Sequence, residues 1–318
     1  MAQLEASKVV LKNPSYDAYF DKVQNRKKLP MSLQQTLTDA FASIPVSAFP
    51  EVPRGKAANT LGEDFYKVIL EEEPFASTTV RSIVTSYRWA PFIPVASDSS
   101  MLSVLLLLSK YRLRNVPVIE SGKASIKNFI TQSAVVKGLE HCQGRDWFDC
   151  IASQLITEVG LPFMSTDEVI CVQSSELVLE AFKLMKENQI GGLPVVEGPE
   201  RNIVGSLSIR EIKFLLLNRE LFSNFRNLTV KDFMNTIASE APDGGEIMIP
   251  ITCSLSSTLG DVIHILSSKM VHRVYVVAAS GKEVAGVITL RDVISCFIFE
   301  PPNYFENYLA SSRQEVNS

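Results

Sequence analysis

Self-similarity constrains this chain more than any other feature of its sequence. Three tripeptides mark equivalent points 77 and 81 residues apart: VPV around Pro117, LPV around Pro194 and VYV around Tyr275. A small hydroxyl side chain follows the centre of each tripeptide by 14 positions, as Thr131, Ser208 and Thr289. A repeat at nearly constant spacing indicates one supersecondary unit that is used three times.

An apolar stripe with helical spacing precedes each tripeptide in the same register. Its four positions are related as i, i+3, i+4 and i+7, which is one face of an amphipathic helix. The residues are Met101, Val104, Leu105 and Leu108, then Val178, Ala181, Phe182 and Met185, then Leu259, Val262, Ile263 and Leu266. Short apolar runs and turn residues flank each stripe, so each copy is predicted to be a β–α–β–β–α unit.

The three units should not fold as isolated modules. A small three-stranded sheet cannot bury both of its faces alone, so the copies are expected to pack in pairs. We assign residues 79–158, 159–222 and 223–306 to the first, second and third copies. The second and third are predicted to form an intact pair, with strand ends and helix starts lining the cleft between them.

Composition excludes several classes of protein. Of the 318 residues 46% are hydrophobic and 21% charged, which suits folded domains rather than disorder. A net charge of −4 argues against nucleic-acid binding. The five Cys show no metal-ligand spacing, and the start lacks an apolar leader. The most hydrophobic stretch, Met101 to Leu108, is too short to span a membrane. We expect a cytoplasmic or nuclear protein without a metal site or membrane segment.

The third copy ends its last strand in the segment GVITLRDVI, where a helix is predicted to begin at Thr289. Two interpretations are open. Thr289 and Asp292 have the spacing of a capping box, in which both side chains satisfy the first helical turn. A carboxylate held at a helix start can also accept hydrogen bonds from a ribose diol, while free amides take a phosphate or sugar oxygen.

Two cationic side chains precede the middle strand of the third copy. His272 and Arg273 should reach the cleft, beside the carboxylate of the same copy, which favours a phosphate contact. The first copy has Arg114 and Asn115 at these positions. The second copy has Gly191 and Gly192, which supply no phosphate ligand and are expected to form a tight helix exit.

These features together resemble the CBS domain, a β–α–β–β–α module that pairs and commonly binds adenosine compounds. The resemblance extends to the plant gamma-type regulatory subunit of the sucrose-nonfermenting-related kinase, the counterpart of AMP-activated protein kinase, over about residues 40–306. The segments that carry it include SIPVSAFP at 43–50, RWAPF at 88–92, IGGLPV at 190–195, HRVYVV at 272–277 and ITLRDVI at 288–294. It implies a non-catalytic subunit of an energy-sensing serine/threonine kinase, with catalytic alpha and beta subunits as partners and AMP, ADP or ATP as ligand.

The resemblance also implies roles for individual residues. Thr289 and Asp292 would hold ribose, and His272 and Arg273 would hold phosphate. A longer version of the ribose pair is formed by Ser208 and Glu211. In the first copy Ala134 stands where the acid should be, so Thr131 cannot hold ribose in the same manner, whereas Arg114 can still serve a phosphate.

The chain departs from the family in its number of repeats, since the family has four and only three are found here. After residues 1–50, where Leu33, Leu37 and Phe41 predict a short amphipathic helix, residues 51–78 read as a linker or remnant of a missing first repeat. The first visible copy should then lack its partner and need cover from another chain, for example in a homo-oligomer. Residues 307–318 are expected to be disordered.

Two other functions are alternatives to the regulatory subunit. The lost repeat, together with Ala134, Gly191 and Gly192, favours a CBS-domain adaptor or scaffold without a physiological nucleotide. Catalysis is disfavoured because the chain contains no nucleophile elbow, phosphate-binding loop, metalloprotease or kinase signature.

Overall fold

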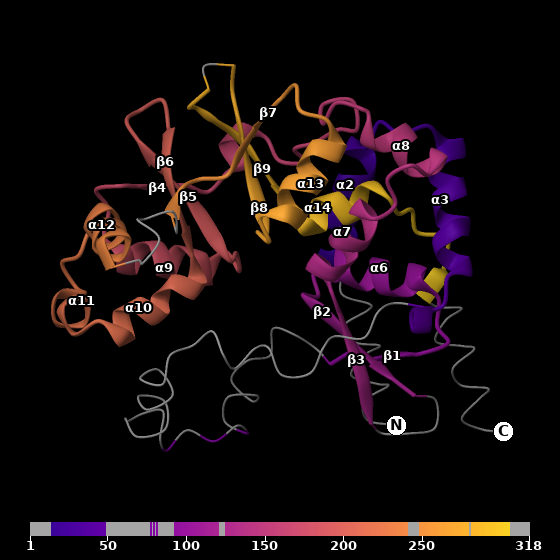
Figure 1. Ribbon diagram of the computed structural model, residues 1–318, viewed down its shortest axis with the longest axis horizontal. Helices are drawn as coiled ribbons and strands as arrows, with labels where there is room; N and C mark the ends of the chain where they lie inside the picture. The colour runs from indigo at the N-terminus through magenta and orange to yellow at the C-terminus, as the bar shows by residue number, and fades with distance from the viewer. Residues whose placement is uncertain are drawn as a thin grey trace.

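The computed structural model describes residues 14–48, 77, 79, 81, 92–120, 125–240, 248–279 and 281–305. Three separate three-stranded sheets follow one another along the chain, and each belongs to one copy of the repeat (Figure 1). In every sheet the first strand is parallel to the second, and the second is antiparallel to the third. The predicted β–α–β–β–α unit is therefore confirmed in all three copies.

The elements of the three copies correspond one to one. The first copy contains β1 (Val95–Ala96), α6 (Met101–Ser109), β2 (Asn115–Ile119), β3 (Ile126–Thr131) and α7 (Gln132–Glu140). The second contains β4 (Val172–Gln173), α9 (Val178–Glu187), β5 (Gly192–Glu197), β6 (Asn202–Ser208), the 3-10 turn η4 (Ile209–Glu211) and α10 (Ile212–Leu217). The third contains β7 (Thr252–Ser254), α13 (Leu259–Ser268), β8 (Arg273–Val277), β9 (Val284–Thr289) and α14 (Leu290–Cys296).

Further elements precede and connect the copies. Before the first copy lie α2 (Pro14–Arg26), α3 (Met31–Ser43) and the 3-10 turn η1 (Val46–Ala48). Between the first and second copies lie α8 (Asp146–Ala152) and the 3-10 turn η3 (Thr166–Glu168). Between the second and third lie α11 (Arg219–Asn224) and α12 (Val230–Glu240).

Backbone details repeat in the same register as the sequence. A residue two or three positions after the first helix of each copy adopts a left-handed conformation, with φ of +56° at Arg112, +54° at Gln189 and +51° at Met270. The middle strands of the first two copies each contain a proline, which cannot donate to a ladder. In these two copies the first strand pairs with the middle strand only from the residue after the proline. In the third copy Tyr275 stands in place of the proline, and its N–H donates to the carbonyl of Ile251.

The second and third copies pair through their sheets, as predicted. The hydroxyls of Ser206 in β6 and Tyr275 in β8 lie 3.0 Å apart. Backbone hydrogen bonds join Ile203 to Lys282, and Val284 to Arg201. A small apolar cluster centred on Val169, Val196 and Val284 fills the contact between the two copies.

The first copy packs differently, because it uses its helices. Helices α6 and α7 lie against α14, and α7 also lies against α13, so the first and third copies share one large core. The second copy has a core of its own, and in Figure 1 it forms the separate lobe with α9 to α12. On β3, Ile126 and Phe129 remain 43% exposed. Phe129 occupies the position of Ser206, which contacts the partner copy in the second–third pair.

The twelve stripe residues are buried, at 6% exposure or less, which confirms the predicted inner faces. Helix α6 is more than amphipathic, however, because all nine of its residues are buried. Helix α3 covers one side of it and α14 another. Its sequence, MLSVLLLLS, is apolar on every side, as a helix enclosed by other helices requires. Within the described residues, no helix combines the length and apolarity needed to cross a membrane.

The N-terminal segment folds onto the first and third copies. The predicted amphipathic helix is present as α3, where Leu37 is buried and Leu33 and Phe41 pack against the large core. Helix α2 was not predicted. Its signal was in the sequence, since Tyr16, Tyr19, Phe20 and Val23 have the i, i+3, i+4, i+7 spacing of one helical face.

Helix α2 is held by buried polar contacts as well as by apolar ones. Lys110, at the end of α6, lies 2.7 Å from both Asp17 of α2 and Glu300. At the other end of α2, the ammonium of Lys27 is buried and donates to the carbonyl of Ile298. Burial lowers the pKa of Lys27 to about 7.

This burial predicts that stability depends on pH. The unfolded chain holds the Lys27 proton up to its ordinary pKa of about 10.4, whereas the folded chain releases it near 7, so the free energy of unfolding should fall as pH drops from about 10 to 7. Urea denaturation across this range should show that slope in the wild type and a flatter one in Lys27→Met. Lys28→Met is the control, because Lys28 is exposed. Equal slopes in wild type and Lys27→Met would contradict the assignment.

Candidate functional site

The third-copy junction forms the predicted capping box. Thr289 is the N-cap of α14, and the Oδ2 atom of Asp292 accepts hydrogen bonds from both the N–H and the hydroxyl of Thr289, each at 2.7 Å. The N–H of Asp292 in turn donates to the hydroxyl oxygen of Thr289 at 3.3 Å. The carboxylate is only 5% exposed, and burial raises its pKa.

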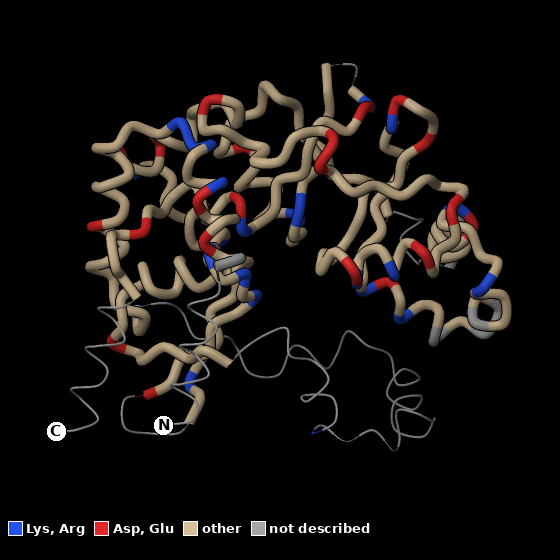
Figure 2. Tube along the Cα trace, turned by 180° about the vertical axis from the view of Figure 1, so that it is seen from behind, with Lys and Arg blue, Asp and Glu red and all other residues tan. Residues whose placement is uncertain are grey.

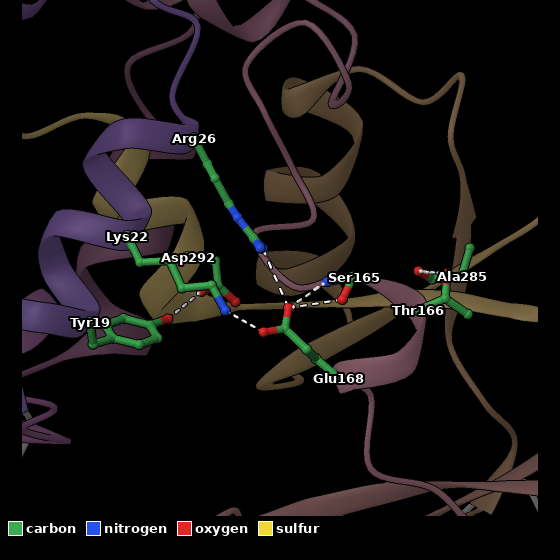
Figure 3. A network of polar contacts seen from close by, with 8 residues as sticks. All are labelled: Tyr19, Lys22, Arg26, Ser165, Thr166, Glu168, Ala285 and Asp292. Atoms are coloured by element: carbon green, nitrogen blue, oxygen red, sulfur yellow. Dashed lines mark hydrogen bonds and ion pairs between the residues drawn. The ribbon is translucent and has the colours of Figure 1, made fainter.

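Helix α2 covers this carboxylate. The hydroxyl of Tyr19 donates to Oδ1 of Asp292 at 3.4 Å (Figure 3). The Arg291 guanidinium lies 3.7 Å from the centre of the Tyr19 ring. Burial and the neighbouring carboxylate raise the pKa of Tyr19 to about 12, so its proton stays available for donation. Asp292 therefore does not face an open cleft in this structure, because the aromatic side chain of Tyr19 lies against it.

The segment that leads into the second copy packs beside the third copy and α2. The hydroxyl of Thr166 donates to the carbonyl of Ala285 in β9 at 3.3 Å, which fixes η3 beside the third copy. Two cations of α2, Lys22 and Arg26, form ion pairs with Glu168 at the end of η3 (Figure 3). Lys22 and the Ser165 cap hold the pKa of Glu168 down to about 2.

The second-copy junction has the same cap but different surroundings. Glu211 accepts from the N–H of Ser208, and the Ser208 hydroxyl accepts from the N–H of Arg210 at 3.3 Å. Burial raises the pKa of Glu211 to about 7, while the positive charge of Arg273 acts in the opposite direction. The pairing of the second and third copies thus places the predicted phosphate ligand Arg273 beside the acid of the other copy.

The glycines of the second copy make room for that arginine. A Cβ atom at Gly192 would lie 1.4 Å from Nη1 of Arg273, and one at Gly191 would lie 3.1 Å from Nη2. The prediction that these glycines form a tight helix exit is wrong, because the left-handed residue after α9 is Gln189 and neither glycine has a positive φ. Their role is steric, since only a residue without a side chain leaves space for the guanidinium.

Cations from all three copies surround His272. Nη2 of Arg210 lies 2.9 Å from its Nε2 atom, and the charges of Arg210, Arg273 and Arg114 act on it. Desolvation and then these three arginines lower the pKa of His272 to about 4, so it is neutral at pH 7. Acidic and basic residues are interspersed over the described trace (Figure 2), so this is a local excess of positive charge.

Arg210 was missed as a candidate, although its signal was present. It is the cation between the hydroxyl and the acid of the second-copy junction, in the position that Arg291 occupies in the third.

In the first copy, the hydroxyl of Thr131 accepts from the N–H of Ala134 at 3.1 Å. Thr131 thus acts as a helix cap in this structure, and Arg114 is the first copy's contribution to the cations around His272.

The second-copy junction combines a hydroxyl, a carboxylate and a guanidinium, which suit a diol and an anionic group. Across the described residues, no group of three or more His, Cys, Asp or Glu side chains is placed to hold a metal ion.

The fold and the paired junctions define a CBS-domain protein, and the CBS domain model matches residues 157–218 and 245–298. The chain is 45% identical to an Arabidopsis thaliana protein named SNF1-related protein kinase regulatory subunit gamma-1-like, over 95% of this chain and 96% of the relative. It belongs to this family of gamma-type regulatory subunits.

Other comparisons agree with this assignment. The Arabidopsis thaliana SNF1-related protein kinase regulatory subunit gamma-1 is 39% identical over 80% of this chain, which spans 61% of that relative. A solved structure from Methanocaldococcus jannaschii, described as a putative archaeal homolog of g-AMPK, superposes with a TM-score of 0.51. It covers 73% of this chain and 77% of the archaeal chain at 18% identity, which shows the shared fold alone.

The space beside Gly192 gives a graded prediction. Gly192→Ala should displace Arg273 and crowd the carbonyl of Leu207, which would lie 2.8 Å from the new Cβ. Overpacking of this kind typically costs about 1–3 kcal/mol. Gly191→Ala, with one contact at 3.1 Å to a flexible side-chain end, should cost clearly less. Urea denaturation of both variants measures the difference, and equal losses would contradict the steric role of Gly192.

Proposed function

We propose that this chain is the non-catalytic gamma-type regulatory subunit of a plant energy-sensing serine/threonine protein kinase, and that it binds an adenine nucleotide at the second-copy junction. The observation that carries the proposal is the placement of Arg273, from the third copy, beside Ser208 and Glu211 of the second. The pairing of two copies builds this arrangement, and neither copy contains it alone.

The chemistry of the junction supports a nucleotide. Glu211 can accept hydrogen bonds from a ribose diol, and the hydroxyl of Ser208 lies beside it at the helix start. Arg273, Arg210 and His272 would then hold the phosphate. An anion among them would relieve the mutual repulsion that depresses the pKa of His272.

The surroundings of the third-copy junction differ. Thr289 and Asp292 stay predicted ribose ligands, but in the structure described they are engaged with each other and with Tyr19. A nucleotide there would have to displace that tyrosine. We therefore assign the first nucleotide to Ser208, Glu211 and Arg273.

Kinase partners follow from the family. The relatives are named regulatory subunits of a protein kinase, and catalytic alpha and beta subunits are the partners we propose, in the cytoplasm or nucleus.

The alignment with the gamma-1-like relative runs over 427 positions, 109 more than the 318 residues of this chain. That excess supports the loss of one repeat. A homo-oligomer through the first copy, where Phe129 is exposed, also stays a proposal.

An adaptor without a ligand is the second candidate. The observation in its favour is the third-copy junction itself, where the cap and Tyr19 use the polar groups that a nucleoside would need. The two candidates differ in one measurable property, because only a nucleotide binder is stabilised by AMP, ADP or ATP.

Nucleotide titration tests the proposal directly. At a ligand concentration of 100 Kd the wild type should gain about 2.7 kcal/mol of stability, seen as a rise in Tm. Arg273→Gln should weaken binding by about 10- to 100-fold, since charge-assisted hydrogen bonds contribute about 1.5–3 kcal/mol. Lys231→Gln is the matched control, because Lys231 is exposed and pairs with Glu197 away from the junction.

Three outcomes of that titration are informative. Loss of binding in Arg273→Gln with an unchanged Tm of the free protein supports the assignment. A flat Tm for the wild type with all three nucleotides favours the adaptor. Equal weakening in Arg273→Gln and Lys231→Gln would point to general electrostatics rather than a built site.

Co-expression tests the partner. With tagged alpha and beta subunits, this chain should co-elute as a stoichiometric complex in size-exclusion chromatography. The chain alone should be run in parallel at several concentrations with light scattering. A self-associated chain that forms no kinase complex would overturn the partner proposal and support the homo-oligomer.

A further inference from the structure

Helix α2 lies over the third-copy junction and also contacts the segment that leads into the second copy. At the junction the Tyr19 ring lies over Arg291, and its hydroxyl reaches Asp292. Farther along α2, Lys22 and Arg26 pair with Glu168 of that segment. Figure 3 shows one helix in contact with both Asp292 and Glu168.

The contacts of Tyr19 resemble those that a nucleoside would make at such a junction. A flat aromatic ring lies on a guanidinium, as a base can, and a hydroxyl points at the carboxylate, as a ribose hydroxyl can. A second guanidinium, that of Arg112, lies 4.9 Å from the centre of the same ring. The tyrosine therefore engages the groups that the junction offers to a base and a sugar.

One buried donor of the junction is left unsatisfied by α2. Arg291 donates its Nε proton to the carbonyl of Ser109 at 2.7 Å. Its Nη2 atom is buried, and it has no hydrogen-bond acceptor in the part of the chain that the structure describes. A buried guanidinium donor without an acceptor indicates a position suited to an anionic oxygen, which the tyrosine does not carry.

We propose that α2 is an intramolecular occupant of the third-copy junction, with Tyr19 in the place of a nucleoside, and that a nucleotide reaches Asp292 and Arg291 only when α2 leaves. The identity of the competing ligand rests on the proposed function. The consequence is a chain whose third-copy junction is covered by its own N-terminal segment, whereas the second-copy junction, at Glu211, has Arg273 of the third copy beside it.

Release of α2 should therefore create a second site. Isothermal titration with AMP should give one site in the wild type and two in the double variant Tyr19→Ala/Lys22→Ala. The second site should disappear again when Asp292→Ala is added to the double variant. Asp21→Ala is the matched control, because Asp21 lies on the exposed side of α2, and it should keep the wild-type stoichiometry.

A readout on α2 itself separates competition from loss of folding. Hydrogen exchange should report faster exchange of α2 amides in Lys22→Ala, whose side chain is exposed and not needed for the core. In that variant AMP at high concentration should accelerate α2 exchange further, at least threefold, while α13 and α14 stay protected. The conservative Tyr19→Phe, which loses only the hydroxyl, should lie between wild type and Tyr19→Ala in affinity for the second AMP.

The outcomes distinguish this inference from the proposed function. If the wild type binds no AMP but the released variant binds it in an Asp292-dependent way, the assignment to Glu211 fails and the occupancy of the junction by α2 holds. If the released variant keeps the wild-type stoichiometry, or binds a second AMP independently of Asp292, the inference is overturned. It is also overturned if AMP binds at Asp292 while α2 remains fully protected.

Discussion

The structure depends on one constraint, which is that a three-stranded β–α–β–β–α unit cannot bury its sheet and its helices alone. The second and third copies meet this constraint by pairing their sheets, with Ser206 against Tyr275. The first copy meets it by packing its helices onto those of the third. The third copy is consequently covered on two sides, and this decides what surrounds each junction.

The same short motif has different neighbours in different copies, and its possible role differs with them. A hydroxyl and an acid three residues apart form a capping box at Ser165, Ser208, Thr258 and Thr289 alike. The box by itself is therefore an element of helix geometry, and it indicates no ligand. At Ser208 a neighbouring copy adds a guanidinium, whereas at Thr289 a preceding helix adds a tyrosine. The junctions therefore differ in what the neighbouring segments add to the same cap.

Much of the fold was predictable, and the candidate site only in part. The repeat, the stripes and the caps are local patterns whose period is set by backbone geometry, so a single sequence carries them. The role of Gly192 was misread, because its reason is Arg273, some 80 residues away in the chain. The position of Arg210 in the junction motif and the apolar spacing of α2 are both visible in the sequence. No pattern of neighbouring residues, however, predicts that Arg210 contacts His272 or that α2 covers Asp292.

By itself, the sequence determined the β–α–β–β–α unit, its three copies, their register and the helix starts at Thr131, Ser208 and Thr289. These follow from periodicity and capping, which act over a few residues. Only the tertiary structure decided that Arg273 reaches the second-copy junction and that Tyr19 covers the third. Both depend on contacts between segments distant in the chain, because Tyr19 reaches Asp292 from a helix that packs on the core shared by the first and third copies.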